Sequence, residues 1–427
     1  MTSPVLDRTA SSAGSAAVKK KEPLSLLLLA LLAVFLLGVR APSGQVTFRL
    51  NDGLDWIKLP DLVLSAGVTG WLLSLLLLAI ALYSCFLLYR GRKLPLVYTL
   101  IFWAGLVSGL LVWAIGSARS SDISLVNLFS GALALSIPMI FGSMGGLLCE
   151  KSGIINIAIE GQLLFGAFSA ALVGSMTGNA WVGLLAAMAG GALVSLVLAV
   201  FSIKYAVDQT IVGVVVNVLV SGLTGFLFVR LLEPNAQTLN SAPKLPLIEI
   251  PVLSQIPLLG PVLFNQSLLV YLMYLVVGLI WWALRKTAWG LRTRAVGEHP
   301  QAADTLGVAV NRLRSTNVLL AGCVAGMGGA FFTLVSVSSF NTNMTAGQGY
   351  IALAALIFGR WKPLGALAAS LLFGFSLQVQ YILALLGASI PTELLAMLPY
   401  LITILAVAGL VGRSRGPAAA GKPYLKG

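Results

Sequence analysis

The feature that most constrains this chain is a recurring apolar run, bounded each time by charges or turn residues, of the size that a lipid-spanning helix needs, roughly 20 residues. Hydrophobic residues make up 58% of the sequence and charged residues only 10%, more apolar sequence than a soluble core can absorb. We therefore predict an all-α, polytopic integral membrane protein with eleven or twelve transmembrane or re-entrant helical segments. The runs fall at about 24–39, 62–89, 95–117, 123–149, 160–177, 180–202, 209–232, 267–285, 315–335, 349–359, 364–385 and 394–411.

The first apolar run resembles a signal peptide, because three lysines at positions 19–21 precede Leu24–Val39. The flank Val39–Pro42 is a poor cleavage site, since a proline follows the nearest small residue. We expect a retained first span, preceded by a disordered cytoplasmic N-terminus over residues 1–22 that is rich in Ser, Ala and Thr.

The formal charge of +13 could suggest a nucleic-acid partner, but the basic residues lie in short loops between apolar runs instead of in one stretch. If the N-terminus is cytoplasmic and each run crosses once, the inside loops hold most of them, as the positive-inside rule requires. We therefore expect a multi-pass protein of the bacterial inner membrane, with both termini cytoplasmic and no nucleic-acid partner. The inside set is Lys19–Lys21, Arg90, Arg92, Lys93, Lys151, Lys204, residues 285–314, Arg360, Lys362, Arg413 and Arg415; the outside set is Arg40, Arg49, Lys58, Arg119, Arg230 and Lys244.

Two stretches break the regular pattern of spans. The run Tyr350–Gly359 is too short to cross alone, and Gly153–Gly161 joins two apolar runs through polar residues. Both are candidates for discontinuous or re-entrant helices, which in transporters point toward the binding site. The segments Asn156–Gln162 and Asn343–Gln348 also echo one another, and counting spans places them on opposite faces, as an inverted repeat would.

Polar side chains inside the spans are costly and usually line an interior or a cavity. Amide groups donate and accept together, which suits nucleobase edges or ribose hydroxyls. Alternatives remain open: the two carboxylates could cap helix N-termini, Asn217 could join helices, and Phe141, Phe165 and Phe168 could stack a base or fill the core. The candidate pathway residues are Asn156, Glu160, Asp208, Gln209, Asn217, Asn343 and Gln348.

Glycines at four-residue spacing let membrane helices pack closely. We therefore assign Gly142, Gly146, Gly322, Gly326 and the neighbouring small residues to packing, not to ligand contact.

The longest polar stretch is Arg285–Arg314. Gly297–Pro300 is interpreted as a turn into a short helix, with the proline in its first turn. Ala302, Ala303, Leu306 and Val308 would give that helix an apolar face for a partner's groove. A plain solvated connector is the alternative.

Three long runs carry a family resemblance in the expected order, over roughly residues 123–412. The run "GLRTRAVGEHPQAADTLGVAVNRLR" resembles the cytoplasmic coupling loop of permease subunits of ATP-binding-cassette importers for simple sugars and nucleosides. The runs "GGLLCEKSGIINIAIEGQLLFGAFSAAL" and "NMTAGQGYIALAALIFGRWKPLGALAASLLFGF" resemble the two signature regions of the nucleoside branch.

The resemblance implies a transport subunit, not an enzyme, that imports nucleosides, or less plausibly sugars, by alternating access. The chain has no G-x-x-x-x-G-K-[ST] motif, so ATP and Mg would be bound by a partner ATPase and no cofactor by this chain. The other implied partners are a second permease subunit, identical or homologous, an extracytoplasmic substrate-binding protein, and the lipid bilayer. We expect no catalytic residue and no metal ligand; the residues assigned to ATPase coupling are Gly297, Glu298, Pro300, Ala302, Ala303, Asp304 and Leu306.

The expected organisation is an N-terminal extension of about three spans over 23–117, a permease core over 118–412 with the coupling loop at 285–314, and a cytoplasmic tail over 413–427. An ion-coupled secondary transporter is one alternative, with Glu160 or Asp208 as the coupling carboxylate. It would not need the loop 285–314. A membrane-embedded metalloenzyme is the second, but the only histidine is His299 and metal-ligand residues do not cluster.

Overall fold

A computed structural model describes residues 23–51, 56, 58–92, 94–118, 121–387, 394, 397 and 416–425. The predicted disordered N-terminus, Arg119, Arg413, Arg415 and, apart from Leu394 and Met397, the predicted span 394–411 lie outside these residues. The described chain contains nine helices long and apolar enough to cross a membrane, and two shorter apolar helices, Pro23–Val39 and Gln348–Phe358. This agrees with the predicted polytopic helical class.

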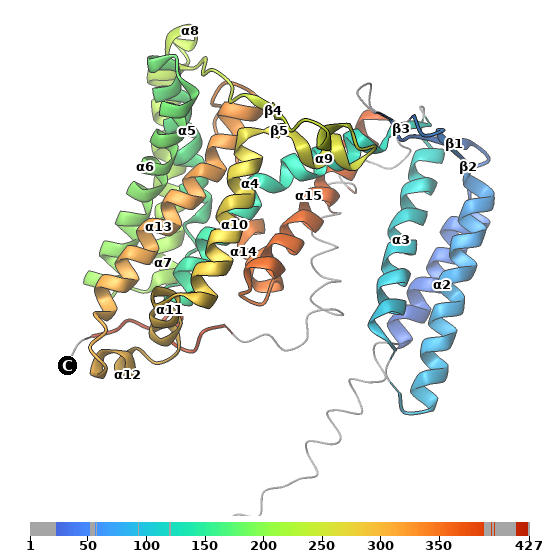
Figure 1. The fold of residues 1–427 in the computed structure, drawn as a ribbon, viewed down its shortest axis with the longest axis horizontal. Helices are drawn as coiled ribbons and strands as arrows, with labels where there is room; N and C mark the ends of the chain where they lie inside the picture. The colour runs from blue at the N-terminus through green and yellow to red at the C-terminus, as the bar shows by residue number, and fades with distance from the viewer. Residues whose placement is uncertain are drawn as a thin grey trace, which may run out of the picture. The chain divides into compact units, whose positions relative to one another are not determined.

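The chain divides into two compact units, the first built mainly of residues before Leu128 and the second mainly of residues 129–378 (Figure 1). The elements of the first unit are η1 (Val34–Val39), β1 (Gln45–Arg49), β2 (Leu62–Ser65), α2 (Ala66–Tyr89), α3 (Leu96–Gly116) and β3 (Asp122–Ser124). The second contains α4 (Leu125–Lys151), α5 (Ile159–Thr177), α6 (Ala180–Ala199), η2 (Val200–Lys204), α7 (Gln209–Leu227), η3 (Phe228–Leu232), α8 (Ala236–Leu239), β4 (Leu247–Glu249), η4 (Leu253–Gln255), α9 (Leu259–Phe264), β5 (Asn265–Ser267), α10 (Leu268–Lys286), α11 (Ala288–Glu298), α12 (Pro300–Thr305), α13 (Val310–Phe331), η5 (Phe332–Ser336), α14 (Gln348–Phe358) and α15 (Pro363–Leu385).

In the first unit, α2 packs against α3 and against the helix that ends in η1. Leu37, Leu77 and Phe102 are fully buried at the centre of this group. A three-stranded sheet of order β2-β1-β3 joins the helix ends, with Phe48 opposite Leu62 in the antiparallel pair and opposite Ile123 in the parallel pair. The apolar run predicted at 62–89 therefore begins with a strand, because its first four residues pair with β1 before the helix starts.

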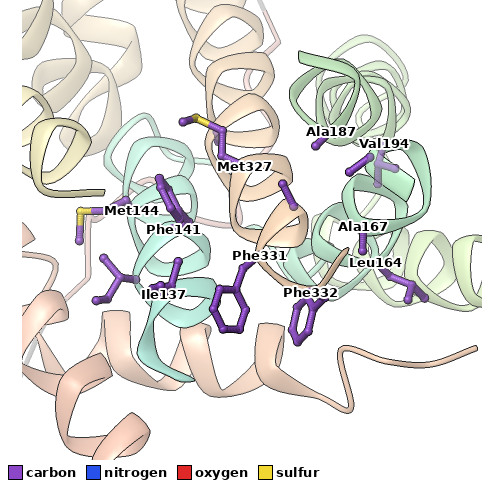
Figure 2. Close-up of a cluster of buried hydrophobic side chains, with 14 of the residues drawn as sticks. Ile137, Phe141, Met144, Leu164, Ala167, Ala187, Val194, Met327, Phe331 and Phe332 are labelled. Atoms are coloured by element: carbon purple, nitrogen blue, oxygen red, sulfur yellow. The ribbon is translucent and has the colours of Figure 1, made fainter. Parts of the chain in front are cut away.

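The second unit is organised around α5, α6 and α13, which pack closely on one another, with α4 alongside (Figure 1). Figure 2 shows this core: Ile137 and Phe141 of α4, Leu164 of α5, Val194 of α6 and Phe331 of α13 belong to one buried cluster. Bulky side chains thus fill the space between these helices, and small residues lie where the helix backbones approach most closely.

The glycines on these helices permit that close approach. A Cβ atom added at Gly322 would meet the carbonyl oxygen of Gly191, and one at Gly326 would meet the carbonyl oxygen of Ala187. A Cβ at Gly142 would lie 2.9 Å from the Cβ of Ala352. The predicted packing role of these glycines is confirmed, as expected where small residues let membrane helices approach.

We call the end of the second unit that carries α11 and α12 the loop end, and the opposite end the far end. Helix α4 ends at the loop end, where Lys151 meets Gly297 of α11. At the far end, the segment after η5 returns past the α8–β4 connection, because the Ala242 amide donates to the Ser338 carbonyl at 2.9 Å. The chain then enters α14, whose 11 residues span only about 16 Å, roughly half of a bilayer's hydrocarbon core.

Candidate functional site

Between α4 and α5 the chain leaves helical structure over residues 154–156, within the turn-rich link from Ser152 to Ala158. Gly153 has φ +90°, a left-handed conformation that glycine adopts without strain. The Ile155 amide donates to the Gln209 Oε1 atom at 2.7 Å, which ties the segment to the first residue of α7. A non-helical break therefore falls within the predicted segment Gly153–Gly161, between two helices that are each long enough to span a membrane.

Asn217 shows how deep this segment reaches. It lies eight positions after Gln209, about 12 Å along α7 from that helix's first residue. Its Oδ1 atom accepts from the Gly161 amide at 2.8 Å, and its Nδ2 atom donates to the Ile157 carbonyl at 2.8 Å. The polar link therefore sits inside the helix bundle, and Asn217 satisfies backbone groups that α5 leaves free at its start.

Asn156 lies in a fully buried amide pair. Its Nδ2 atom donates to Gln162 Oε1 at 3.1 Å, and Gln162 Nε2 donates back to Asn156 Oδ1 at 3.2 Å. Gln162 also donates to Ser195 Oγ of α6 at 2.8 Å. All three residues have 0% exposed surface, so this cluster joins α5, α6 and the link within the core.

Glu160 caps a helix, but not the one it belongs to. Its Oε1 atom accepts from Thr345 Oγ1 at 2.6 Å and from the Gly347 amide at 2.9 Å, and its Oε2 atom accepts from the Gly349 amide at 2.7 Å. These donors lie at the N-terminus of α14, where a carboxylate satisfies free N–H groups and the positive end of the helix dipole. The capping alternative is thus the observed geometry, applied to a helix 188 positions later in the chain (348 − 160).

This contact corrects one expectation. The segments Asn156–Gln162 and Asn343–Gln348 were predicted to lie on opposite faces of the membrane, whereas the Glu160 bonds bring them together. The span count treated 349–359 as a complete crossing, but α14 crosses only about half the bilayer and its first residues begin inside the bundle.

The other end of α14 is held by a second carboxylate. Trp361, just after α14, donates its indole Nε1–H to Glu150 Oε2 near the end of α4, and Glu150 is only 5% exposed. Arg360 and Trp361 have φ values of +53° and +51°, and Asn343 and Ala346 at the other end have +55° and +45°. Helix α14 is therefore flanked at both ends by left-handed backbone, which is costly outside glycine and asparagine and gathers at functional sites.

The remaining predicted pathway residues take different positions. Asp208 is exposed and caps α7, accepting from the amides of Thr210 and Ile211 at 2.8 and 3.1 Å. Asn343 is exposed on the loop before α14. Gln348 Oε1 and Gln209 Nε2 are buried without a hydrogen-bond partner among the described residues. The structure thus joins Glu160, Gln209 and Asn217 to one polar region, whereas Asp208 serves its own helix.

Several residues of this region were not singled out from the sequence. Tyr350 is 47% exposed and its hydroxyl accepts from Asn217 Nδ2 at 3.1 Å, so it stands at the edge of the buried network. Thr345 and Gln162 also belong to the network. A threonine three residues before a glutamine was the available signal at α14, since Ser and Thr mark helix starts. Phe168, considered for base stacking, instead packs edge-on against buried Phe340, 5.3 Å between ring centroids.

The loop 285–314 folds into two helices at the loop end. Helix α11 runs to Glu298, so Gly297 and Glu298 close a helix instead of forming the predicted turn, and Pro300 opens α12 at its first turn as predicted. The predicted single apolar face is wrong: Ala303 is buried against Val296 and Val310, whereas Ala302 is exposed and Leu306 is 85% exposed. Helix α12 ends at Thr305, so Leu306 and Val308 lie beyond it, and the adjacent Ala302 and Ala303 point in different directions around the helix axis.

The coupling candidates therefore separate into two sets. Gly297, Pro300 and Ala303 face the second unit and are buried; Glu298, Ala302 and Leu306 are exposed, and Asp304 lies between. Gly297 is the closest point of contact, since a Cβ there would meet the carbonyl oxygen of Lys151 at the end of α4.

A bundle of long apolar helices, with a half-length helix held inside it and a two-helix loop packed on the adjoining turn, is the fold of a polytopic membrane protein. The comparisons with known proteins identify its class. Residues 128–407 match the family model described as branched-chain amino acid transport system / permease component. The chain is 41% identical to the guanosine ABC transporter permease protein NupQ of Bacillus subtilis over 304 residues, which cover 69% of this chain and 95% of that protein.

Two further relatives are also named as ABC transporter permease proteins. Identity is 38% over 318 residues with the nucleoside ABC transporter permease protein NupC of Lactococcus lactis, covering 71% of this chain and 98% of that protein. It is 31% over 252 residues with the putative glucose ABC transporter permease protein TsgC13 of Haloferax volcanii, covering 58% and 75%. The chain belongs to this family of ABC transporter permease subunits.

Membership of this permease family bears on the two alternative functions, an ion-coupled secondary transporter and a membrane-embedded metalloenzyme. A permease subunit of this family is not catalytic by itself, and it works with an ATPase and other transporter components. This agrees with the absence of an ATP-binding P-loop from the sequence. It disfavours both the ion-coupled transporter and the membrane enzyme. Residues 1–127 precede the region that the family model matches.

Proposed function

We propose that this chain imports nucleosides across a bacterial inner membrane, as one of two permease subunits that share a partner ATPase. Nucleosides are favoured because two relatives aligned over 95% and 98% of their own lengths carry guanosine and nucleoside in their names. The glucose permease relative, aligned over 75% of its length, keeps simple sugars as the second candidate.

The observation that carries the mechanism is the link from α11 to α14 through residues 150–160. Gly297 touches Lys151, Glu150 holds Trp361, the third residue after α14, and Glu160 holds the first turn of α14. Movement of α11 would therefore reach both ends of α14 through one short segment. We assign to this segment the transmission of ATPase movement into the bundle.

In this mechanism a substrate-loaded binding protein delivers the nucleoside at the far end. ATP binding, with Mg, closes the ATPase pair and pushes α11 and α12. The α4–α5 link moves with them and α14 follows, which changes access to the pathway from one side of the membrane to the other. Alternating access requires such an element with two arrangements, and the left-handed backbone at both ends of α14 marks where it would pivot.

The pathway is placed along the exposed edge of this polar region. Tyr350 is half-exposed as a residue, and its hydroxyl accepts from Asn217 behind it. Gln348 holds a carbonyl oxygen without a partner among the described residues. The Tyr350 ring could stack on the base of a nucleoside. The hydroxyl and amide groups beside that ring could exchange hydrogen bonds with the sugar hydroxyls, which both donate and accept. Asn343, exposed before α14, would meet substrate first, and Asp208, Gln209, Asn156 and Glu160 would shape the pathway from behind.

The partner ATPase is placed on the exposed side of α12. Ala302 and Leu306 project from it, and an isolated exposed leucine beside small residues fits a groove on a partner. The loop end and both termini are assigned to the cytoplasm.

Reconstitution tests the function. The permease, its ATPase and its binding protein are placed in proteoliposomes, and uptake of radiolabelled guanosine, uridine and glucose is followed with and without ATP. We expect uptake of nucleoside only when ATP and the binding protein are both present. Glucose uptake in place of nucleoside uptake would select the second candidate, and ATP-independent uptake by the chain alone would overturn the importer mechanism.

A further inference from the structure

A short C-terminal segment occupies the junction between the two loop-end helices and the α4–α5 link. Residues 416–424, here called the C-terminal strap, run beside α11 and α12 (Figure 1, red). The Ala419 amide donates to the Gly297 carbonyl at 2.9 Å, and the Ala418 amide donates to Glu298 Oε2 at 3.2 Å. The strap is therefore bonded to the last turn of α11, where that helix touches Lys151.

A buried arginine ties the strap to the link. Arg314, near the start of α13, is 1% exposed. Its Nε atom donates to the Ser152 carbonyl at 3.0 Å and its Nη1 atom donates to the Lys422 carbonyl at 3.2 Å. Backbone carbonyls of two distant segments thus accept from two of the three guanidinium nitrogens, whereas Nη2 is buried without a partner among the described residues. Removing the strap would take away one of these two acceptors.

The end of the strap closes a small apolar cluster. Tyr424 packs with Val296 of α11, Ala303 of α12 and Val310 of α13. Burial raises the pKa of the Tyr424 hydroxyl, and its hydrogen bond to Asp304 raises that pKa further. The phenol hydroxyl donates to the Asp304 carboxylate of α12.

Along its length the strap also contacts Ile155 of the α4–α5 link and Trp361, which follows α14. A Cβ at Gly421 would lie 2.9 Å from Ile155 Cδ1, and one at Gly416 would lie 3.0 Å from the ring of Trp361. Nine residues thus contact α11, α12, α13, the link and Trp361. A solvated tail would make none of these contacts.

We propose that the C-terminal strap is a coupling element that makes α11 and α12 move as one body with the α4–α5 link, so that ATPase movement reaches α14. The proposal rests on the proposed function. A rigid junction passes displacement on, whereas a junction with the strap removed lets the two helices shift without carrying residues 150–160. The strap's direct bonds and its contact with Arg314 are what would make the junction rigid.

The test compares the full chain with a form that ends at Arg415, each assembled with the ATPase and the loaded binding protein. ATP hydrolysis and solute uptake are measured on the same proteoliposomes. We expect hydrolysis to continue and uptake per ATP to fall about tenfold or more, within the usual range of coupling between sites. Unchanged uptake per ATP would overturn the proposal. So would joint loss of hydrolysis and uptake in assembled complexes, because the strap would then only support ATPase docking.

Point variants keep the test decisive if the shortened chain fails to assemble. Tyr424→Ala removes the anchor and should lower uptake per ATP in the same way, whereas Leu425→Ala, whose side chain is 75% exposed beside the strap, should not. Equal uptake per ATP in Tyr424→Ala and Leu425→Ala would overturn the proposal. A synthetic peptide of residues 413–427 should restore coupling to the shortened chain, and the same peptide with Tyr424→Ala should not. The ratio is taken with whichever solute the full complex carries, so a wrong substrate assignment is seen separately.

Discussion

Glu160 is the side chain on which the position of α14 depends most directly. Its two oxygens accept from three donors of the α14 start. Glu160→Gln keeps the shape of the side chain but replaces one carboxylate oxygen with an NH₂ group. That NH₂ group would face an N–H or O–H donor at the start of α14. We expect a loss of about 1–3 kcal/mol in the free energy of unfolding, the cost of a buried unmatched polar group. We also expect ATP-dependent uptake to fall by about tenfold or more, the effect of roughly 1.4 kcal/mol or more on the active arrangement.

A cap of another helix provides the control for this variant. Asn179 caps α6 at the far end, accepting from the Trp181 amide at 2.9 Å. Asn179→Ala should cost about 0.5–2 kcal/mol of stability, the usual loss of an N-cap, and leave the uptake rate of the folded protein unchanged. If Glu160→Gln behaved in the same way, the carboxylate would be an ordinary cap and not part of the transport machinery.

Asn156 and Tyr350 separate packing from substrate contact. Asn156→Ala leaves the buried Gln162 Oε1 atom without its donor, while Gln162 Nε2 keeps its bond to Ser195, and it should lower stability by about 1–3 kcal/mol, with the KM for nucleoside unchanged. Tyr350→Phe removes the hydroxyl of a half-exposed residue and should change stability by less than about 0.5 kcal/mol. Its KM should rise. Denaturation in detergent and concentration-dependent uptake measure the two quantities, and a raised KM in Asn156→Ala would place that amide in the pathway.

Helix α14 lies so close to α5 that a single methyl group tests their contact. A Cβ at Gly349 would lie 2.5 Å from the backbone nitrogen and Cα of Glu160, so Gly349→Ala must push α14 away. We expect about 1–3 kcal/mol of destabilisation from overpacking and loss of most uptake, because the Glu160 bonds would lengthen. Gly278→Ala on α10, where a Cβ would meet nothing within 4 Å, is the matched control and should transport normally. Normal uptake by Gly349→Ala would mean that α14 does not need this contact.

The elements differ in how far the sequence could predict them. Apolar runs predict the spans well, because length and composition alone decide whether a helix can cross a bilayer. The run 209–232, for example, matches α7 and η3. The partner of Glu160 could not be predicted, since its donors lie about 185 positions further on and a cap can serve any helix that ends beside it. The strap was missed for a related reason: most of its polar contacts use backbone amides and carbonyls, which carry no chemical signature in the sequence, and the partners of Tyr424 lie more than 110 positions earlier in the chain.

The charges of the molecule as a whole predict its orientation. Among the described residues of the second unit, the loop end carries Lys151, Lys204, Arg285, Lys286, Arg292, Arg294, Arg312, Arg314, Arg360, Lys362 and Lys422, and the far end carries only Arg230 and Lys244. Helix α14 and the loop before it together make one crossing, from Ser338 near Ala242 at the far end to Trp361 near Glu150 at the loop end. The short helix therefore does not disturb the alternation of spans, and the basic end should face the cytoplasm.

Cysteine labelling tests this orientation directly. With the native Cys85, Cys149 and Cys323 replaced by alanine, a single cysteine is placed at Gln301 on α12 or at Gln237 on α8, both exposed. In intact cells a membrane-impermeant maleimide should label Gln237→Cys and spare Gln301→Cys, and lysis should make both reactive. The reverse pattern would put α11 and α12 outside, where no ATP-driven partner could reach them. Because the strap, the α4–α5 link and, through Trp361 and Glu150, the C-terminal end of α14 are all bonded to that end, their assigned roles in coupling would be lost with it.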